Sequence, residues 1–172
     1  MPTPTEQTAP EPARSRLIAA VGAGSAVLIA GAWFVELGLG LLPCKLCLEQ
    51  RWPHYAAIAV AALGWLLARN RAQRAMVLIL LSGLMLWSVG LGTYHAGVEW
   101  GWFAGPNDCG GRAAPMAAGV GDLMKQLGSA RVVACTEAAW RFLGLSLAGW
   151  NVLFSFALLV LAVAGLRVRR AG

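Results

Sequence analysis

Four cysteines are the residues of this chain that could carry redox chemistry, and two of them form a CxxC motif. Cys44 and Cys47 are separated by Lys45 and Leu46. A disulfide that closes so short a loop removes little entropy from the unfolded chain, so this pair would be a poor structural staple. A CxxC pair at the start of a helix is instead typical of reversible dithiol exchange, because the helix dipole favours a thiolate there. The motif therefore favours thiol exchange.

Cys109 and Cys135 complete the set and leave other interpretations open. An even number of cysteines on the oxidising side of a membrane can form two structural disulfides. A zinc site is a poorer match, because residues 48–108 separate the CxxC motif from the next cysteine and no second CxxC motif follows. The sequence therefore predicts no metal site.

Two basic side chains could act beside the cysteines. Arg51 lies one helical turn after Cys47, which puts both residues on one face of a helix. Its guanidinium can stabilise a thiolate, and it can stabilise negative charge that develops on an electron acceptor. Snorkelling to lipid headgroups is the alternative role for such an arginine. His95, at the end of a later apolar segment, is either a second site residue or a structural group.

The composition indicates that these residues work at a membrane. The chain is 58% hydrophobic and 13% charged, whereas an ordinary soluble domain is about 25% charged. Residues 53–67 make only about 22 Å of helix, too short for a hydrocarbon core of about 30 Å. We therefore expect this helix to begin near Cys44–Cys47, with Pro53 as an internal kink. The predicted spans are residues 17–42, 46–67, 75–94 and 147–166.

The basic residues predict the orientation of these spans. The net charge of +6 could suggest nucleic acid as a partner, but the excess is confined to segments that flank the spans. These residues are Arg14, Arg16, Arg69, Arg71, Arg74, Arg167, Arg169 and Arg170. By the positive-inside rule, both termini are then cytoplasmic. The basic excess encodes topology and predicts no nucleic-acid binding.

With this orientation, the one long loop, residues 96–142, lies on the periplasmic side. Its apolar residues at helical spacing predict a short amphipathic helix on the membrane surface; they are Met116, Val120, Leu123, Met124 and Leu127. Residues 1–16 and 167–172 are expected as cytoplasmic tails, the first of them disordered. Glu36, near the outer end of the first span, is expected to reach the interface. The predicted fold is an all-α membrane protein, a four-transmembrane-helix bundle with a long periplasmic loop.

Three strings resemble a known family. Pro43-Cys44-Lys45-Leu46-Cys47-Leu48-Glu49-Gln50-Arg51 resembles the opening of the second helix in the disulfide bond formation protein B (DsbB) family. Similar matches are Tyr94-His95-Ala96-Gly97-Val98-Glu99 and the segment from Cys135 through Trp140-Arg141-Phe142-Leu143-Gly144-Leu145 to Trp150. The agreement extends from Trp33 to the fourth predicted span. Gln50 departs from the pattern, because the family often has an acid before the arginine.

The resemblance implies a protein-disulfide oxidoreductase that reoxidises a periplasmic thioredoxin-fold dithiol oxidase, DsbA. It implies that Cys109 and Cys135 form a disulfide in the periplasmic loop and that DsbA attacks Cys109. Cys135 would then exchange with Cys44, and Cys47 would pass the electrons on. Because DsbA is a strong oxidant, its reoxidation must be driven by the final electron acceptor.

For that acceptor the resemblance implies a membrane quinone, either ubiquinone or menaquinone. Arg51 and His95 would lie beside it, with Cys47 facing it. The implied location is the bacterial inner membrane, with the redox cysteines on the periplasmic side and membrane lipid around the spans.

Two alternatives remain open from the sequence. A quinone-linked thiol oxidoreductase of the vitamin K epoxide reductase type also combines a small helical bundle with CxxC chemistry, but its motif lies late in the bundle. A four-span membrane scaffold with structural disulfides is the non-enzymatic alternative. Cysteines that change redox state during turnover would exclude the scaffold.

Overall fold

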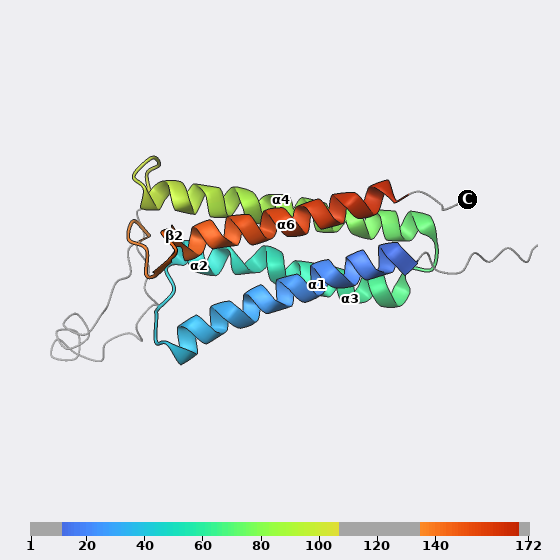
Figure 1. Ribbon diagram of the computed structural model, residues 1–172, viewed down its shortest axis with the longest axis horizontal. Coiled ribbons are helices and arrows are strands. Elements are labelled where there is room, and N and C mark those ends of the chain that lie inside the picture. Colours follow the sequence, from blue (N-terminus) through green and yellow to red (C-terminus); the bar gives the residue numbers. More distant parts are fainter. Residues whose placement is uncertain (1–11, 107–134, 169–172) are drawn as a thin grey trace, which may run out of the picture.

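The computed structural model describes residues 12–106 and 135–168, which are mostly helical. The predicted amphipathic helix and Cys109 lie outside the described residues. Four long helices run side by side (Figure 1), with α1 packed on α3 and α4 packed on α6. Their bounds are α1 Pro12–Trp33, α3 Arg51–Leu67, α4 Arg71–Glu99 and α6 Leu147–Arg167.

All four helices contribute to one apolar core. Its buried members are Ile18, Val21, Ala57, Ala61, Leu78, Leu81, Met85, Leu158 and Ala162. Small residues let the helices approach closely, as at Gly22, where an added Cβ would lie 2.7 Å from the Cβ of Ala61. Many large apolar side chains point outward instead, including Leu63, Leu66 and Phe156. Such an outer surface suits a lipid environment.

Three helical segments of the described chain are long and apolar enough to cross a membrane. They are Ala13–Gly38, Arg71–Glu99 and Leu147–Arg167. The first of them includes a π-helical end, η1 Phe34–Gly38, and begins inside the predicted tail. The all-α membrane class predicted from the sequence is thus confirmed.

The second apolar segment is divided into α2 Lys45–Glu49 and α3, with Gln50 between them. The interruption lies at Gln50, three residues before the kink expected at Pro53. Proline has no N–H to donate to the carbonyl of Glu49, so the α-helical ladder fails at that turn. Gln50 keeps helical angles, φ −65° and ψ −18°. The 17 residues of α3 span about 26 Å, which is short for a bilayer core without α2.

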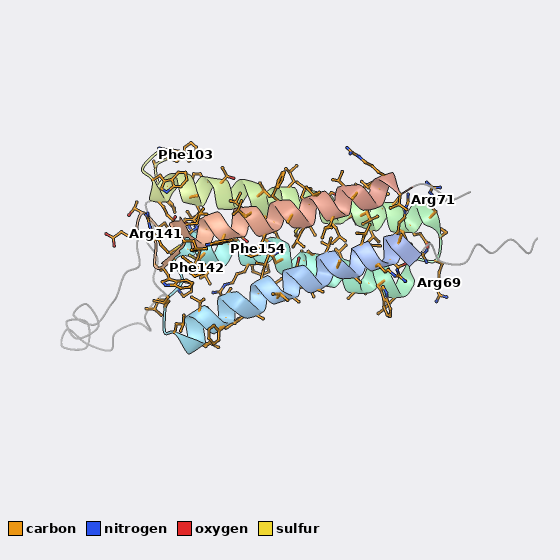
Figure 2. All side chains as sticks on the ribbon, viewed as in Figure 1. Arg69, Arg71, Phe103, Arg141, Phe142 and Phe154 are labelled. Carbon is orange, nitrogen blue, oxygen red and sulfur yellow. The ribbon has the colours of Figure 1, made fainter. Side chains whose placement is uncertain are left out.

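One end of the bundle is rich in arginine (Figure 2, labels Arg69 and Arg71). Arg14 donates to the carbonyls of Leu166 and Val168 at the end of α6, and Arg74 donates to the carbonyl of Ala68. These cations lie where the helix dipoles of α6 and α3 place negative charge. The arginines at this end therefore also satisfy backbone carbonyls at the ends of α6 and α3.

The opposite end carries the functional candidates. There α2 lies beside α4, and a hairpin of β1 Arg141–Phe142 with β2 Leu145–Ser146 packs on α6 (Figure 1). Leu143 (φ 52°) and Gly144 (φ 82°) make a two-residue turn with positive φ at both positions, as in a type I′ hairpin. Ser146 then caps α6 by accepting from the N–H of Gly149. The hairpin ties the segment after Cys135 to the start of α6.

Candidate thiol exchange site

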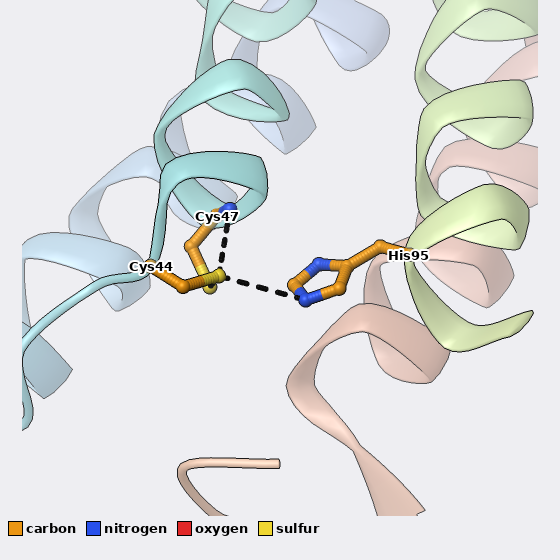
Figure 3. A group of neighbouring side chains, drawn as sticks. All are labelled: Cys44, Cys47 and His95. Atoms are coloured by element: carbon orange, nitrogen blue, oxygen red, sulfur yellow. Dashed lines mark hydrogen bonds between the residues drawn. The ribbon is translucent and has the colours of Figure 1, made fainter. Parts of the chain in front are cut away.

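The CxxC motif is placed by the start of α2. Cys44 is the N-cap residue, and its Sγ accepts a hydrogen bond from the backbone N–H of Cys47 at 3.3 Å. The two sulfurs lie 2.8 Å apart as free thiols (Figure 3). A disulfide bond is about 2.0 Å long, so a small side-chain movement closes the pair. The local fold thus presents a dithiol ready to form a disulfide.

His95 reaches the motif from α4 (Figure 3). Its Nε2 lies 3.5 Å from Cys44 Sγ, and its ring is 3% exposed. The side-chain amide of Gln50 hydrogen-bonds its Nδ1. A carboxylate oxygen of Glu99 lies 3.7 Å from Nε2. The imidazole is therefore held between the cysteine pair and an amide, beside a buried acid.

Cys135 brings a third thiol to the same place. It is buried and packs against Cys44, Leu46 and Val98. Cys44 and the backbone N–H groups of Lys45 and Leu46, at the start of α2, lie close enough to its thiol to influence the pKa of Cys135. The structure therefore brings three of the four predicted redox cysteines together, and the fourth, Cys109, lies outside the described residues.

The thiols of Cys44 and Cys135 hold their protons tightly. The hydrogen bond to Cys47, together with burial, raises the pKa of Cys44 to about 12, and His95 opposes this shift. Burial raises the pKa of Cys135, while the backbone N–H groups of Leu46 and Lys45 act in the opposite direction. These shifts disfavour the thiolate form of both Cys44 and Cys135.

Arg51 is buried at the junction of α3 with η1. Its guanidinium pairs with the carboxylate of Glu36 at 2.7 Å and lies over the ring of Trp33, 5.3 Å from the centroid. The two charged side chains are 10% and 11% exposed. The indole N–H of Trp33 donates to the hydroxyl of Tyr55. Glu36, which is expected at the interface, is the ion-pair partner of this arginine.

A cavity of about 20 Å³ adjoins the motif. That volume holds about one water molecule. It is lined by Cys44, Cys47, His95, Glu99, Glu137, Ala139, Leu147 and Ala148. Protons could leave the thiols through such a water, but an aromatic ring does not fit.

The two sulfurs and the imidazole of His95 lie within 4.8 Å of one another, as ligands of a metal ion would. Two thiolates on tetrahedral zinc, each about 2.3 Å from the ion, would be about 3.8 Å apart. The observed 2.8 Å between the sulfurs fits a dithiol better than a pair of zinc ligands.

Sequence reasoning missed a group of buried polar residues behind the motif. Gln50 was recognised only as a departure from the family pattern, yet its amide bonds both His95 and Asn151. Asn151 in turn bonds His54. A polar residue inside an apolar segment is the signal that could have found them, because such residues are rarely idle in a membrane.

Comparison with known proteins agrees with this geometry. The family model for disulfide bond formation protein DsbB matches residues 14–165. A disulfide bond formation protein B of Xanthomonas oryzae pv. oryzae is 33% identical over 155 residues, which cover 84% of this chain and 86% of the relative.

Other relatives give the same picture. A protein of the same name from an Acidovorax species is 32% identical over 170 residues, covering 87% of this chain and 88% of the relative. An uncharacterized protein of Rickettsia prowazekii is 28% identical over 137 residues, covering 79% and 78%. No solved structure matches the chain. With the family model spanning most of its length and relatives of this identity and coverage, the chain belongs to the DsbB family of disulfide bond formation proteins.

Proposed function

We propose that the protein is a quinone-dependent thiol:disulfide oxidoreductase that reoxidises a periplasmic DsbA-like partner. Membership of the DsbB family supports a role in disulfide bond formation. The observation that carries the finer proposal is the burial of Cys135 against Cys44. The sulfur of Cys44 also lies 2.8 Å from the sulfur of Cys47. A structural disulfide needs two sulfurs, whereas a relay between two pairs needs three that can meet.

The relay consists of successive disulfide exchanges. A thiolate of the partner attacks Cys109 in the Cys109–Cys135 disulfide, and the electron pair of the broken bond goes to Cys135. Cys135 then attacks Cys44 in the Cys44–Cys47 disulfide, and Cys47 leaves as a thiolate. Its place in the first turn of α2 favours that charge.

The quinone, ubiquinone or menaquinone, supplies the final acceptor for two electrons and two protons. We place it at Arg51, because a guanidinium has five N–H donors and Glu36 accepts only some of them. The neighbouring side chains of Trp33 and Tyr55 are 41% and 37% exposed, so a quinone could reach Arg51 from the lipid beside them. The donors and the aromatic surroundings fit a quinone carbonyl and ring. Both ring nitrogens of His95 already have partners. We therefore propose that His95 acts on Cys44 and does not bind the quinone.

The membrane arrangement is part of the proposal. We infer that α2 and α3 together form a fourth span, between those of α1 and α4. The arginine-rich end would face the cytoplasm, by the positive-inside rule. The thiols would then face the periplasm of the bacterial inner membrane, where disulfides persist.

The test is quinone reduction by the purified protein supplied with a reduced DsbA-like partner, followed by quinone absorbance. We expect turnover in the wild type and none in Cys135→Ser. With the wild-type protein, a partner variant that lacks its second active-site cysteine should stay joined to Cys109, because its thiolate opens the Cys109–Cys135 disulfide and it has no second thiol to release it. Cysteine pairs that stay oxidised while no quinone is reduced would indicate a scaffold. An adduct that maps to Cys44 or Cys47 would reverse the assigned order of the pairs.

A further inference from the structure

A chain of hydrogen bonds connects the CxxC motif with the middle of the bundle. From Cys44 it passes through His95 on α4, Gln50 before α3 and Asn151 on α6. It continues from Asn151 Oδ1 to His54 Nε2 at 3.1 Å and from His54 Nδ1 to Ser25 Oγ at 3.4 Å. Ser25 lies on α1, so all four long helices contribute a member.

Most of this chain is shielded from water. Ser25, His54 and His95 are 0%, 2% and 3% exposed, and Gln50 is 7% exposed. Ser88 and Ser155 branch from it at His54. Unsatisfied polar groups inside a membrane bundle are costly, so the orientation of each group is set by its neighbours.

The donors all point toward the cysteine pair. Asn151 Oδ1 can only accept, so His54 Nε2 carries a proton and donates to it. Asn151 Nδ2 donates to Gln50 Oε1 at 2.8 Å. This leaves the Gln50 Nε2 group to donate to His95 Nδ1.

The tautomer of His95 follows from that last bond. A neutral imidazole that accepts at Nδ1 carries its proton on Nε2. Nε2 faces Cys44 Sγ at 3.5 Å, with Glu99 Oε1 at 3.7 Å. A proton on Nδ1 would oppose the Gln50 donor.

We propose that Gln50 is a positioning residue, which holds His95 with its Nε2–H directed at Cys44 so that this sulfur can leave as a thiolate. This rests on the proposed function, in which a Cys44–Cys135 disulfide forms and is then broken. The second thiol of the partner attacks the mixed disulfide, so that the partner leaves oxidised and Cys109 is freed as a thiolate. The Cys109 thiolate then attacks Cys135, so that the Cys109–Cys135 bond forms and the bond between Cys135 and Cys44 breaks. The electron pair goes to Cys44 Sγ, where the Nε2–H and the backbone N–H of Cys47 receive the charge. Asn151 holds the amide of Gln50 in one orientation, so it acts on His95 only through Gln50.

The first test reads the tautomer directly. The chain has two histidines, so a protein labelled with ¹⁵N-histidine gives a simple NMR spectrum, and His54→Asn assigns its signals. We expect the His95 proton on Nε2 in the reduced wild type. A proton on Nδ1 would mean that the hydrogen-bond donors from Cys44 to His54 point away from Cys44, and this result would overturn the proposal.

The second test measures how readily the thiol of Cys44 forms a thiolate. Cys44 is kept as the sole thiol by Cys47→Ala, Cys109→Ser and Cys135→Ser, and its alkylation by iodoacetamide is followed against pH. Among the described residues, the titratable groups that then share the cavity with Cys44 are His95, Glu99 and Glu137. In Gln50→Met, of similar length but without a donor, we expect the pH profile to move upward and the rate at pH 7 to fall about tenfold. A tenfold change corresponds to about 1.4 kcal/mol.

Matched variants separate positioning from general damage. Asn151→Leu should lower the alkylation rate less than Gln50→Met, because Gln50 remains but can turn. Ser82→Ala removes a half-buried hydroxyl of α4 whose bond within the described residues is to its own helix, at the carbonyl of Leu78, and should leave the profile unchanged. An unchanged profile in folded Gln50→Met would overturn the positioning role.

Neither test uses a quinone or a partner, so the two proposals fail separately. Loss of quinone turnover in the wild type, together with an Nε2 proton, would reject the proposed function and leave the geometry of His95 standing. Quinone turnover together with an Nδ1 proton would reject only the role of Gln50.

Discussion

Arg51 shows at the scale of one residue how a charge can be kept near the edge of a membrane. Its ion pair with Glu36 is almost fully shielded, and a buried pair of this kind contributes little net stability because both ions lose their hydration. Charged residues at membrane depth usually serve function. The face of Trp33 adds a cation–π contact, which holds the guanidinium plane in one orientation.

We expect Arg51→Gln to raise the Michaelis constant for quinone and to slow its reduction, by roughly 10- to 150-fold together. A lost hydrogen bond to a charged group is worth about 1.5–3 kcal/mol, and about 1.4 kcal/mol is a factor of ten. Arg51→Lys should be partly active, because lysine keeps the charge but loses the planar fork. Steady-state quinone reduction is the measurement, beside a single-turnover oxidation of the partner, which should be nearly unchanged.

The control for charge alone is Arg69→Gln, because Arg69 is an exposed arginine at the other end of the bundle. It should behave as the wild type. Normal quinone kinetics in Arg51→Gln would reduce Arg51 to a structural partner of Glu36.

The spacing of residues predicted part of this site. Local geometry alone places Cys44 and Cys47 together, and the family resemblance brought Cys135 to them. The contacts of Gln50 with Asn151 and of Arg51 with Glu36 could not be predicted in this way. They depend on how each helix is rotated about its axis, which is set by packing between helices far apart in sequence.

At the scale of elements, small residues decide how closely the helices pack. At Gly22 on α1 the neighbour is the Cβ of Ala61 on α3, which is fixed to the backbone and cannot turn away. At Gly92 on α4 an added Cβ would meet a methyl group of Val152 at 2.7 Å and the amide of Asn151 at 3.2 Å. The same close approach that fills the core therefore also brings α4 and α6 together at the polar chain.

Gly22→Ala should lower the free energy of unfolding by about 1–3 kcal/mol, the usual effect of an inserted methyl group in a packed core. Gly31→Ala is the matched control on the same helix, because nothing lies within 4 Å of its added Cβ. Alanine is the better helix former by about 0.8–1.0 kcal/mol, so this control should be neutral or stabilising. Thermal unfolding in detergent compares them, and equal effects would show that α1 and α3 are not in contact there.

Hydropathy placed the helices, but their interruptions needed the structure. The break at Gln50 results from the missing N–H of Pro53, yet a proline of this kind can also kink a helix further along. No strand was expected at the hairpin of residues 141–146, which begins in the last two residues of the predicted loop and continues up to the fourth predicted span. Its turn places Leu143 at φ 52°, a conformation that leucine rarely adopts, so Gly144 is the one residue of the turn whose type is typical of its conformation.

The whole molecule has two chemically different ends. Arginines gather at one end, where Arg14 and Arg74 donate to helix carbonyls. At the other end are the thiols and the buried acids Glu36 and Glu99. A dithiol relay works only if the second end faces an oxidising compartment, so the function depends on which way the protein is inserted.

The orientation can be tested with reporter fusions. A reporter placed within residues 69–74 should be cytoplasmic, because the arginines of this turn stay on the side where the positive-inside rule keeps them. One placed within residues 111–130 should be periplasmic, since α4 runs from the arginine-rich end to the thiol end. Paired reporters that are active on only one side of the membrane, such as alkaline phosphatase for the periplasm and green fluorescent protein for the cytoplasm, give opposite signals at each site. The reverse pattern would place Cys44 and Cys47 in a compartment that keeps thiols reduced, and the relay from partner to quinone could not then run in the proposed direction.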